Sequence, residues 1–222
     1  MSVREPVLHK PRLRERAYEK FTQQLVNRSI LPGQFVSQRE LVQLTGLPLG
    51  AIRELIPRLE ADGLVTTIPQ RGMQVAAVDL SLIRNAFQLR LILECEAAAH
   101  FAVHASDEDI REIRESHDEI VAEAEREITD QLRDRAQAVD WAFHDTLIDS
   151  LGNAIIDDIY RVNSIKIRLI RQEETRLLSR LIIPVMSEHA KIIDALEARD
   201  PAAASDAIAE HITSARNRAT RI

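Results

Sequence analysis

The spacing of apolar residues divides the chain into two parts. Across residues 12–27, Ala17, Phe21 and Leu25 recur every four positions, which is the spacing of one helical face and predicts an amphipathic helix. From residue 80 onwards, apolar residues follow a helical period over long stretches, and no stretch alternates as a strand would. We therefore expect a head of short elements followed by a body of long helices.

Capping signals place two further short helices in the head. Ser37 followed by Glu40 is the signature of a capping box, and it predicts a helix that runs to about Thr45. After a short turn, a third helix is expected over residues 49–61, with Gly63 closing it just beyond its last turn. The two helices and the turn between them form a helix–turn–helix.

Two β-rich runs follow the helix–turn–helix. Leu-Val-Thr-Thr-Ile at residues 64–68 and Met-Gln-Val-Ala-Ala at residues 73–77 flank Pro-Gln-Arg-Gly, which predicts a hairpin. A helix, a helix–turn–helix and a two-stranded hairpin, in that order, are typical of a winged helix–turn–helix.

The remainder of the chain contains helical stretches separated by caps and breaks. They are expected at residues 80–104, 107–127, 130–151, 154–178, 181–199 and 202–219. Six helices of this length favour an antiparallel bundle. The prediction is thus a mostly α protein, with a winged helix–turn–helix at residues 1–75, a linker at residues 76–79 and an all-α antiparallel bundle at residues 80–222.

Composition narrows the class of protein. Apolar residues make up 45% of the 222 residues, which is enough for a substantial core, and no run approaches the ~20 apolar residues that span a bilayer. The N-terminal residues are charged and show no secretory signal. The single cysteine, Cys95, excludes an internal disulfide and lies in a helical apolar run, where we expect a buried, inert thiol. A cytoplasmic protein without a membrane partner is expected.

Charge is distributed unevenly between the two parts. Residues 1–75 contain 11 Lys+Arg and 7 Asp+Glu, a net charge of +4, whereas residues 76–222 contain 18 and 28, a net charge of −10. A basic head on an acidic body is what we expect when only the head meets an anionic polymer such as DNA.

The head offers candidates for contact with double-stranded DNA. The second helix of a helix–turn–helix enters the major groove, so the first turn of the helix over residues 49–61 would face the bases and Arg53 would reach a phosphate or a guanine edge. The alternative is that these arginines are solvated surface residues. Four of them lie on one small domain, which favours DNA binding: Arg39, Arg53, Arg58 and Arg71. The candidate DNA-binding residues are Arg39, Leu49, Gly50, Arg53, Arg58, Arg71 and Gly72.

Helical spacing in the body allows a metal site. Asp140 and His144 lie four apart and share one helical face, and His189 and His211 stand amid apolar residues on the last two helices. Imidazoles with a carboxylate suit zinc or nickel, and manganese or iron less well. By spacing alone, His100 and His104, with Glu96 one turn earlier, form an equally good pair, and any of these histidines can instead be a hydrogen-bonded core residue.

The head resembles a known family. The run Leu-Pro-Gly-Gln-Phe-Val-Ser-Gln-Arg-Glu-Leu, continued by Ala-Ile-Arg-Glu, Leu-Glu-Ala-Asp-Gly-Leu and Arg-Gly-Met-Gln-Val, is similar to the DNA-binding domain of the GntR family of bacterial transcriptional regulators. The resemblance covers residues 12–76 and implies that Arg39, Arg53 and Gly72, together with Arg71, contact DNA. Pro48-Leu49-Gly50 departs from the family's usual Ser/Thr-Arg-Thr/Ser, so one base-reading arginine is absent and the operator sequence does not carry over.

The body resembles the FadR-type effector domain of the same family. Its markers occur in order, from Leu-Arg-Leu-Ile-Leu-Glu and Asp-Trp-Ala-Phe-His to Leu-Gly-Asn, Ser-Glu-His-Ala-Lys and Ala-Glu-His-Ile, and the helix count resembles the vanillate-regulator-like subgroup. The resemblance implies that Asp140, His144, His189 and His211 bind a divalent metal, and it leaves His100 and His104 without a role.

The resemblance also implies a pocket for an effector beside the metal. By this resemblance, the side chain of Arg90 is expected to point into the cavity. The alternative is that Arg90 forms a salt bridge with Glu94, four residues later. Asn163 and Arg168, on the fourth helix of the body, are further candidates for effector binding.

The leading hypothesis is a homodimeric regulator, expected to be a repressor. Its two heads would bind a palindromic operator, and a small organic acid at the metal would control DNA affinity. Two alternatives use the same Asp/His site: a metalloenzyme, and a sensor for which the metal itself is the signal. No general base, nucleophile or oxyanion donor is recognisable beside the four ligands, which argues against an enzyme.

Overall fold

The computed structural model describes residues 13–174 and 179–220 of the chain. The described residues form two compact units, and the chain passes from the first to the second between Val78 and Asp79. Within the described ranges, no helix is long and apolar enough to cross a membrane.

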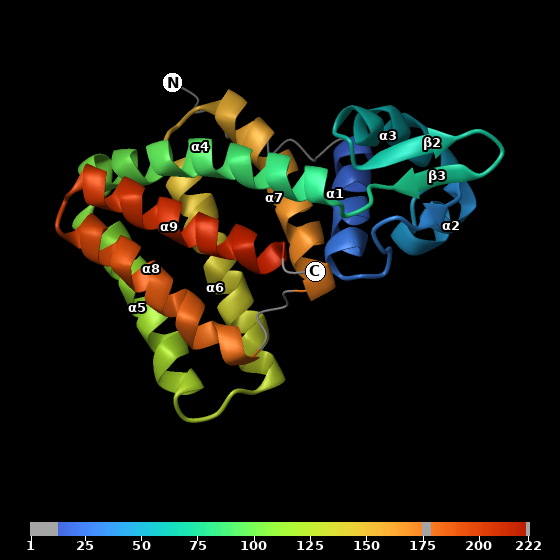
Figure 1. Ribbon diagram of the computed structural model, residues 1–222. Coiled ribbons are helices and arrows are strands. Elements are labelled where there is room, and N and C mark those ends of the chain that lie inside the picture. The colour runs from blue at the N-terminus through green and yellow to red at the C-terminus, as the bar shows by residue number, and fades with distance from the viewer. Residues whose placement is uncertain (1–12, 175–178, 221–222) are drawn as a thin grey trace, which may run out of the picture. The chain divides into compact units, whose positions relative to one another are not determined.

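The head is a winged helix–turn–helix, as predicted (Figure 1). Its elements are α1 (Leu13–Val26), β1 (Phe35–Val36), α2 (Gln38–Thr45), α3 (Leu49–Ala61), β2 (Val65–Ile68) and β3 (Gly72–Val75). The three helices pack against one another around fully buried apolar side chains, including Phe21 from α1, Leu41 from α2 and Ile52 from α3. This burial explains why short helices, marginal by themselves, hold their places.

The sheet of the head has one strand more than the sequence predicted. Its order is β1-β3-β2, and both pairings are antiparallel, with Val36 opposite Met73 and Thr67 opposite Met73 on the other side. The prediction of a two-stranded wing was therefore incomplete. Strand β1 is only two residues long, too short to show an alternating pattern in the sequence.

Local signals fix the turns of the head. Both hydrogen bonds of the expected capping box are present: Glu40 N donates to Ser37 Oγ at 3.2 Å, and Ser37 N donates to Glu40 Oε2 at 2.7 Å. Gly46 ends α2 in the left-handed conformation, with φ of 66°. Gly72 also has a positive φ, of 88°, and a Cβ there would lie 2.9 Å from the carbonyl oxygen of Val36. Only glycine fits at the start of β3.

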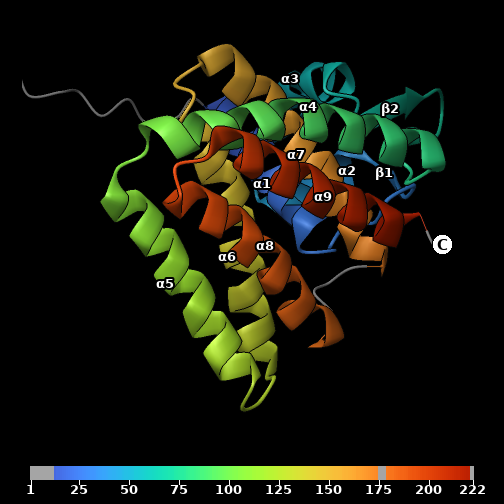
Figure 2. The same ribbon diagram turned by 60° about the vertical axis from the view of Figure 1, so that its left-hand side comes forward.

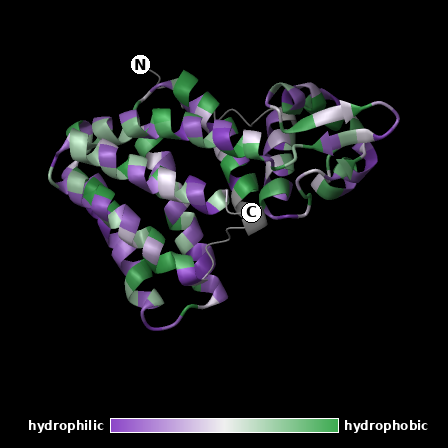
Figure 3. Ribbon diagram, in the orientation of Figure 1, coloured by the Kyte–Doolittle hydropathy of each residue, from purple (hydrophilic) through white to green (hydrophobic). Residues whose placement is uncertain are grey.

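The body contains six α-helices and one short 3-10 helix among its described residues. They are α4 (Leu80–His104), α5 (Asp107–Ala124), α6 (Asp130–Asp149), α7 (Ala154–Glu174), η1 (Ser179–Leu181), α8 (Ile182–Glu197) and α9 (Pro201–Ala219). Helix α4 packs along α9 and α7, and α8 packs along α9 and α5 (Figure 2). Hydrophobic residues recur along the helices between hydrophilic ones, as Figure 3 shows, and every α-helix of the body contributes buried apolar side chains to the core.

In the body, the sequence predicted where the helices begin more accurately than where they end. Side-chain caps at Asp79, Ser106, Thr129 and Asp200 begin four of the helices. The expected ends at residues 127, 151 and 199 lie two or three residues beyond the observed ones, because the chain already turns there and no single cap marks the stop. Residues 175–178, the expected end of the fourth helix of the body, lie outside the described residues.

Cys95 is less buried than expected. It is half-buried on α4, and its Sγ lies 3.7 Å from the carbonyl oxygen of Ser205 on α9. Burial raises the pKa of the Cys95 thiol, so the neutral, unreactive form predominates at neutral pH.

Candidate functional site

Three helices of the body bring four potential metal ligands together. Asp140 and His144 lie one turn apart on α6, His189 lies on α8, and His211 lies on α9. One nitrogen or oxygen from each residue lies within 4.8 Å of those from the others, and all four side chains are buried. We call these four residues the Asp/His cluster. Among the described residues it is the one group of three or more such side chains close enough to hold an ion.

Each histidine of the cluster has a polar partner close to its Nδ1 atom. His144 Nδ1 lies 2.8 Å from Glu94 Oε2, and His211 Nδ1 lies 2.8 Å from Glu188 Oε2. His189 Nδ1 lies 3.0 Å from the ring Nε2 of His117. Three separate partners therefore orient the three rings.

The Nε2 atoms of the cluster face one another. Those of His144, His189 and His211 are buried and make no hydrogen bond within the described residues. Burying a polar atom without a partner costs ~1–3 kcal/mol, so three such atoms at one point call for a ligand. Asp140 adds a carboxylate, with Oδ1 3.6 Å from His189 Nε2 and Oδ2 accepting a hydrogen bond from Gln137. The donor set fits a divalent metal ion.

Burial keeps His189 and His211 in the state that metal binding requires. It lowers the pKa of His211 to about 4, and it lowers the pKa of His189 well below its ordinary value, with the neighbouring histidines adding to the shift. Both rings are therefore neutral at pH 7, and a neutral imidazole can offer a lone pair to a metal.

Glu94 is the centre of a buried polar network beside the cluster. Arg90 Nε and the Tyr160 hydroxyl each donate to Glu94 Oε1 at 2.6 Å, and Glu94 Oε2 faces His144. Burial by itself would raise the pKa of Glu94, but Arg90 and His144 outweigh it and lower the pKa to about 2. Glu94 is thus a carboxylate that ties α4 and α7 to the cluster.

A small cavity adjoins the cluster. Its lining is contributed by Arg90, Trp141, His144, Asp145, Tyr160, Ser164, Ile167 and Arg168. His144 belongs to both the cavity and the cluster, so a ligand in the cavity would lie beside a metal ion held by the cluster. Arg90 Nη1 and Arg168 Nε are buried there and make no hydrogen bond within the described residues.

The three predicted effector residues have different surroundings. Arg90 makes the salt bridge to Glu94 that the sequence offered as its alternative, and it also lines the cavity. Arg168 lines the cavity as well, stacked 4.4 Å over the ring of Trp141 with Nη2 3.2 Å from Asp145. Asn163 is buried away from the cavity lining, and its amide donates to the carbonyl oxygen of Ala86 at 3.0 Å.

His100 and His104 lie apart from the cluster. Their rings stack with centroids 4.1 Å apart, and His104 Nδ1 is 2.9 Å from the carbonyl oxygen of His100. His104 is exposed, and the described residues bring no third ligand to the pair. The two pairs thus have the same spacing in the sequence, but only Asp140 and His144 lie among further potential metal ligands.

Sequence reasoning missed the residues that support the cluster. Four residues contact a histidine of the Asp/His cluster or one another, and the sequence had not made any of them a candidate site residue. They are Glu94, His117, Tyr160 and Glu188. His117 was visible as a histidine placed four residues after Ile113 on an apolar face, and Glu94 as the partner of Arg90. Neither pattern in the sequence predicts which helix packs against His117 or Glu94.

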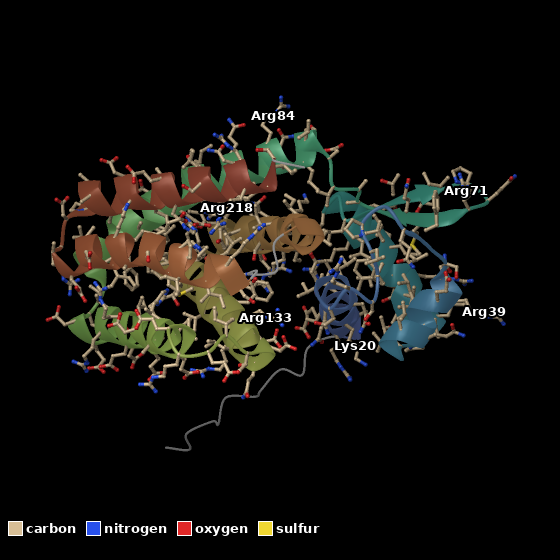
Figure 4. The ribbon with its side chains drawn as sticks, turned by 60° about the horizontal axis from the view of Figure 1, so that its bottom comes forward. Lys20, Arg39, Arg71, Arg84, Arg133 and Arg218 are labelled. Carbon is tan, nitrogen blue, oxygen red and sulfur yellow. The ribbon has the colours of Figure 1, made fainter. Side chains whose placement is uncertain are left out.

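The predicted DNA-binding residues lie on the surface of the head. Leu49 and Gly50 are exposed in the first turn of α3, and Arg53 is exposed one turn later, with Nε 3.3 Å from Gln38 Oε1. Figure 4 shows Arg39 on α2 and Arg71 in the wing, both at the surface of the head.

Two of the predicted arginines also pack on aromatic rings. Arg71 lies 4.3 Å over the ring of Phe35, and Arg58 lies 4.1 Å over the ring of Tyr18. Arg58 is only half-exposed. Its stacking on α1 gives it a structural role within the head.

The head has the architecture of a DNA-binding unit, and the body is an all-helical unit that buries the Asp/His cluster. This combination is typical of a transcriptional regulator. Residues 13–75 match the bacterial regulatory proteins of the gntR family, and residues 85–214 match the FCD domain. The chain belongs to the GntR family of transcriptional regulators that carry an FCD domain.

Individual relatives agree with this membership. The chain is 24% identical over 211 residues to the HTH-type transcriptional regulator BphR of Paraburkholderia xenovorans, covering 94% of this chain and 86% of BphR. It shares its fold with McbR/YncC of E. coli, with a TM-score of 0.74, 17% identity, and coverage of 92% and 95% of the two chains. It also resembles a structure described as the metal-free FCD domain of TM0439, with a TM-score of 0.53, 21% identity, and coverage of 65% and 95%.

Proposed function

We propose that this regulator binds DNA with an affinity controlled by a small carboxylate, which binds at a divalent metal in the Asp/His cluster. The observation that carries the proposal is the convergence of three Nε2 atoms and Asp140 beside a cavity that contains Arg90. Nitrogen-rich donor sets favour zinc or nickel, with manganese or iron as weaker candidates. The metal-free description of the TM0439 domain supports the idea that domains of this fold bind metals.

The cavity supplies complementary charge for a carboxylate. Arg90 Nη1 makes no hydrogen bond within the described residues, and it belongs to a side chain held rigidly by Glu94. A bound metal would add positive charge and a coordination position, and Arg90 would orient the second carboxylate oxygen. Trp141, Ser164 and Arg168 then face the remainder of the effector and select its size.

We propose that the effector acts by releasing the protein, as a repressor, from its operator in the bacterial cytoplasm. A ligand changes an equilibrium only by binding one state more tightly than the other. A tenfold loss of DNA affinity requires about 1.4 kcal/mol of differential binding. The exposed first turn of α3, with Arg53, and the wing tip at Arg71 are the surfaces proposed to contact the operator.

We also propose a homodimer, so that two heads meet a palindromic operator. Helices α4 and α7 pack together and expose Ile92, Ile155 and Ile159, which are 61%, 72% and 46% exposed. These exposed apolar side chains on two packed helices are the ones we propose to be buried in the dimer interface. Light scattering should give twice the monomer mass, and Ile92→Glu should halve it, whereas Ile183→Glu on α8 should not. A monomeric wild-type protein would refute this part of the proposal.

The central experiment joins metal, effector and DNA. An operator is first selected from random duplexes by the zinc-loaded protein, and a panel of small organic acids is then tested for thermal stabilisation of the body. An acid that stabilises the metal-loaded protein should weaken operator binding in fluorescence anisotropy, and Arg90→Met should abolish both effects. If no acid stabilises the loaded protein, the effector proposal fails.

A metal sensor is the second candidate, because four protein ligands are enough for a closed tetrahedral site. In that case metal alone should change operator affinity, without any organic acid. Comparing anisotropy for the metal-free and the metal-loaded protein distinguishes the two. The metalloenzyme alternative is set aside, since the family consists of transcriptional regulators.

A further inference from the structure

The three histidines of the Asp/His cluster are not supported in the same way. Carboxylates face the Nδ1 atoms of His144 and His211, whereas a ring nitrogen of His117, on α5, faces that of His189. His117 is itself buried. Its position raises the question of which nitrogen carries each proton.

The hydrogen-bond partners determine the proton positions, beginning with the backbone carbonyl that His117 contacts. His117 Nδ1 lies 2.7 Å from the carbonyl oxygen of Ile113, and a carbonyl oxygen can only accept, so this nitrogen carries the proton. In a neutral His117 the Nε2 atom is then a lone pair, which accepts the Nδ1 proton of His189 at 3.0 Å. This leaves the lone pair of His189 on Nε2, the atom that faces the other ligands of the cluster.

We propose that His117 is a positioning residue for the metal site, holding His189 in the tautomer that can bind a metal through Nε2. The inference rests on the proposed metal binding of the cluster. Its mechanism is the relay from the Ile113 carbonyl through His117 to His189. Without an acceptor at that place, His189 is free to carry its proton on Nε2, and in that tautomer it has no lone pair for the metal.

Packing limits the freedom of both rings. Phe143 contacts them edge-on or tilted, with its centroid 5.2 Å from that of His117 and 4.8 Å from that of His189. The relay differs from the other two supports in adding no charge. Glu94 and Glu188 each need an arginine partner, Arg90 and Arg218, whereas His117 needs only a backbone carbonyl.

The test compares two substitutions of His117, of which only one provides a hydrogen-bond acceptor. His117→Leu fills the space but accepts no hydrogen bond, and His117→Gln offers a side-chain oxygen as acceptor. Zinc affinity is measured by competition with a chromophoric chelator, with His104→Leu as the control. Loss of a partner behind a ligating histidine typically costs about 10–100-fold in metal affinity, so His117→Leu should weaken zinc by this factor. His117→Gln should recover most of the loss, and the control should bind like the wild type.

A second readout does not depend on metal. Nitrogen-15 NMR of the histidine rings in the metal-free, full-length protein should show His189 protonated at Nδ1 in the wild type and in His117→Gln, and at Nε2 in a substantial fraction of His117→Leu. Equal zinc affinity in His117→Leu and wild type would overturn the inference. So would equal losses in both variants, which would indicate a packing role alone. If the wild type binds no divalent metal, the proposed function fails, and the NMR tautomer still decides the relay.

Discussion

Glu94 should be the polar side chain on which the stability of the body depends most. The substitution Glu94→Gln keeps its shape but removes the charge that Arg90, His144 and the Tyr160 hydroxyl share. The pKa of this fully buried carboxyl falls from 4.5 to about 2, which corresponds to about 3 kcal/mol. Breaking a buried ion pair by removing one partner costs about 3–5 kcal/mol, because the other charge stays buried. Both routes predict a loss of several kcal/mol at pH 7.

The sign of the pH dependence follows from the lowered pKa. A carboxyl whose pKa is lower in the folded state stabilises that state above its unfolded pKa, and the contribution is lost as the pH falls through the folded pKa. The wild-type advantage over Glu94→Gln should thus be complete above about pH 4.5 and should shrink towards pH 2. Glu188, with a pKa of about 2 as well, weakens both proteins alike over that range.

The assay is urea unfolding of the metal-free protein followed by tryptophan fluorescence. Trp141 is the single tryptophan, and it lies on α6 of the body, so the signal reports that unit and not the head. Glu96→Gln is the matched control, since Glu96 is exposed on the same helix and its substitution should change stability by less than about 0.5 kcal/mol. If Glu94→Gln is no more destabilising than Glu96→Gln, the buried network does not stabilise the fold as argued.

Three further predictions concern the metal, the DNA and the wing. Zinc at 100 times its Kd should stabilise the wild type by about 2.7 kcal/mol in thermal unfolding, and His211→Ala should lose this gain; an unchanged gain would exclude His211 as a ligand. Arg53→Ala should weaken operator binding and, if Arg53 contacts a phosphate, reduce the salt slope by about 1; unchanged anisotropy titrations at two salt concentrations would remove it from the interface. Gly72→Ala should destabilise the head by about 1–3 kcal/mol through its positive φ and the close Val36 carbonyl, and an unaltered melting curve of the head would contradict this.

The sequence predicted what depends on local signals. The capping box at Ser37 fixed the start of α2, and the periodicity beyond residue 80 gave the helices of the body. The two-residue strand β1 escaped prediction, because it owes its conformation to pairing with β3 and not to its own pattern. The boundary between the two domains, with its linker at residues 76–79, stays a prediction.

The Asp/His cluster was only partly accessible from the sequence. Spacing offered Asp140 with His144 and His100 with His104 as equals, and only the family resemblance chose between them. The fold separates them by burial: the first pair lies inside the bundle, and His104 is exposed. The supports of the cluster were inaccessible, because Glu94 and His117 meet their partners across helix interfaces whose register no local pattern encodes.

The described network reaches every α-helix of the body. The contributing side chains are Arg90 and Glu94 from α4, His117 from α5, Asp140 and His144 from α6, Tyr160 from α7, Glu188 and His189 from α8, and His211 and Arg218 from α9. A metal ion that drew the Nε2 atoms together would therefore act on six helices at once, because each helix contributes a hydrogen bond, an ion pair or a close polar contact to the network. Such a site suits a switch, because small displacements at one point become a change in the packing of the whole domain. It would also explain why a regulator places its sensor in the bundle centre, because an effector at the proposed site would act on the contacts that hold the helices together.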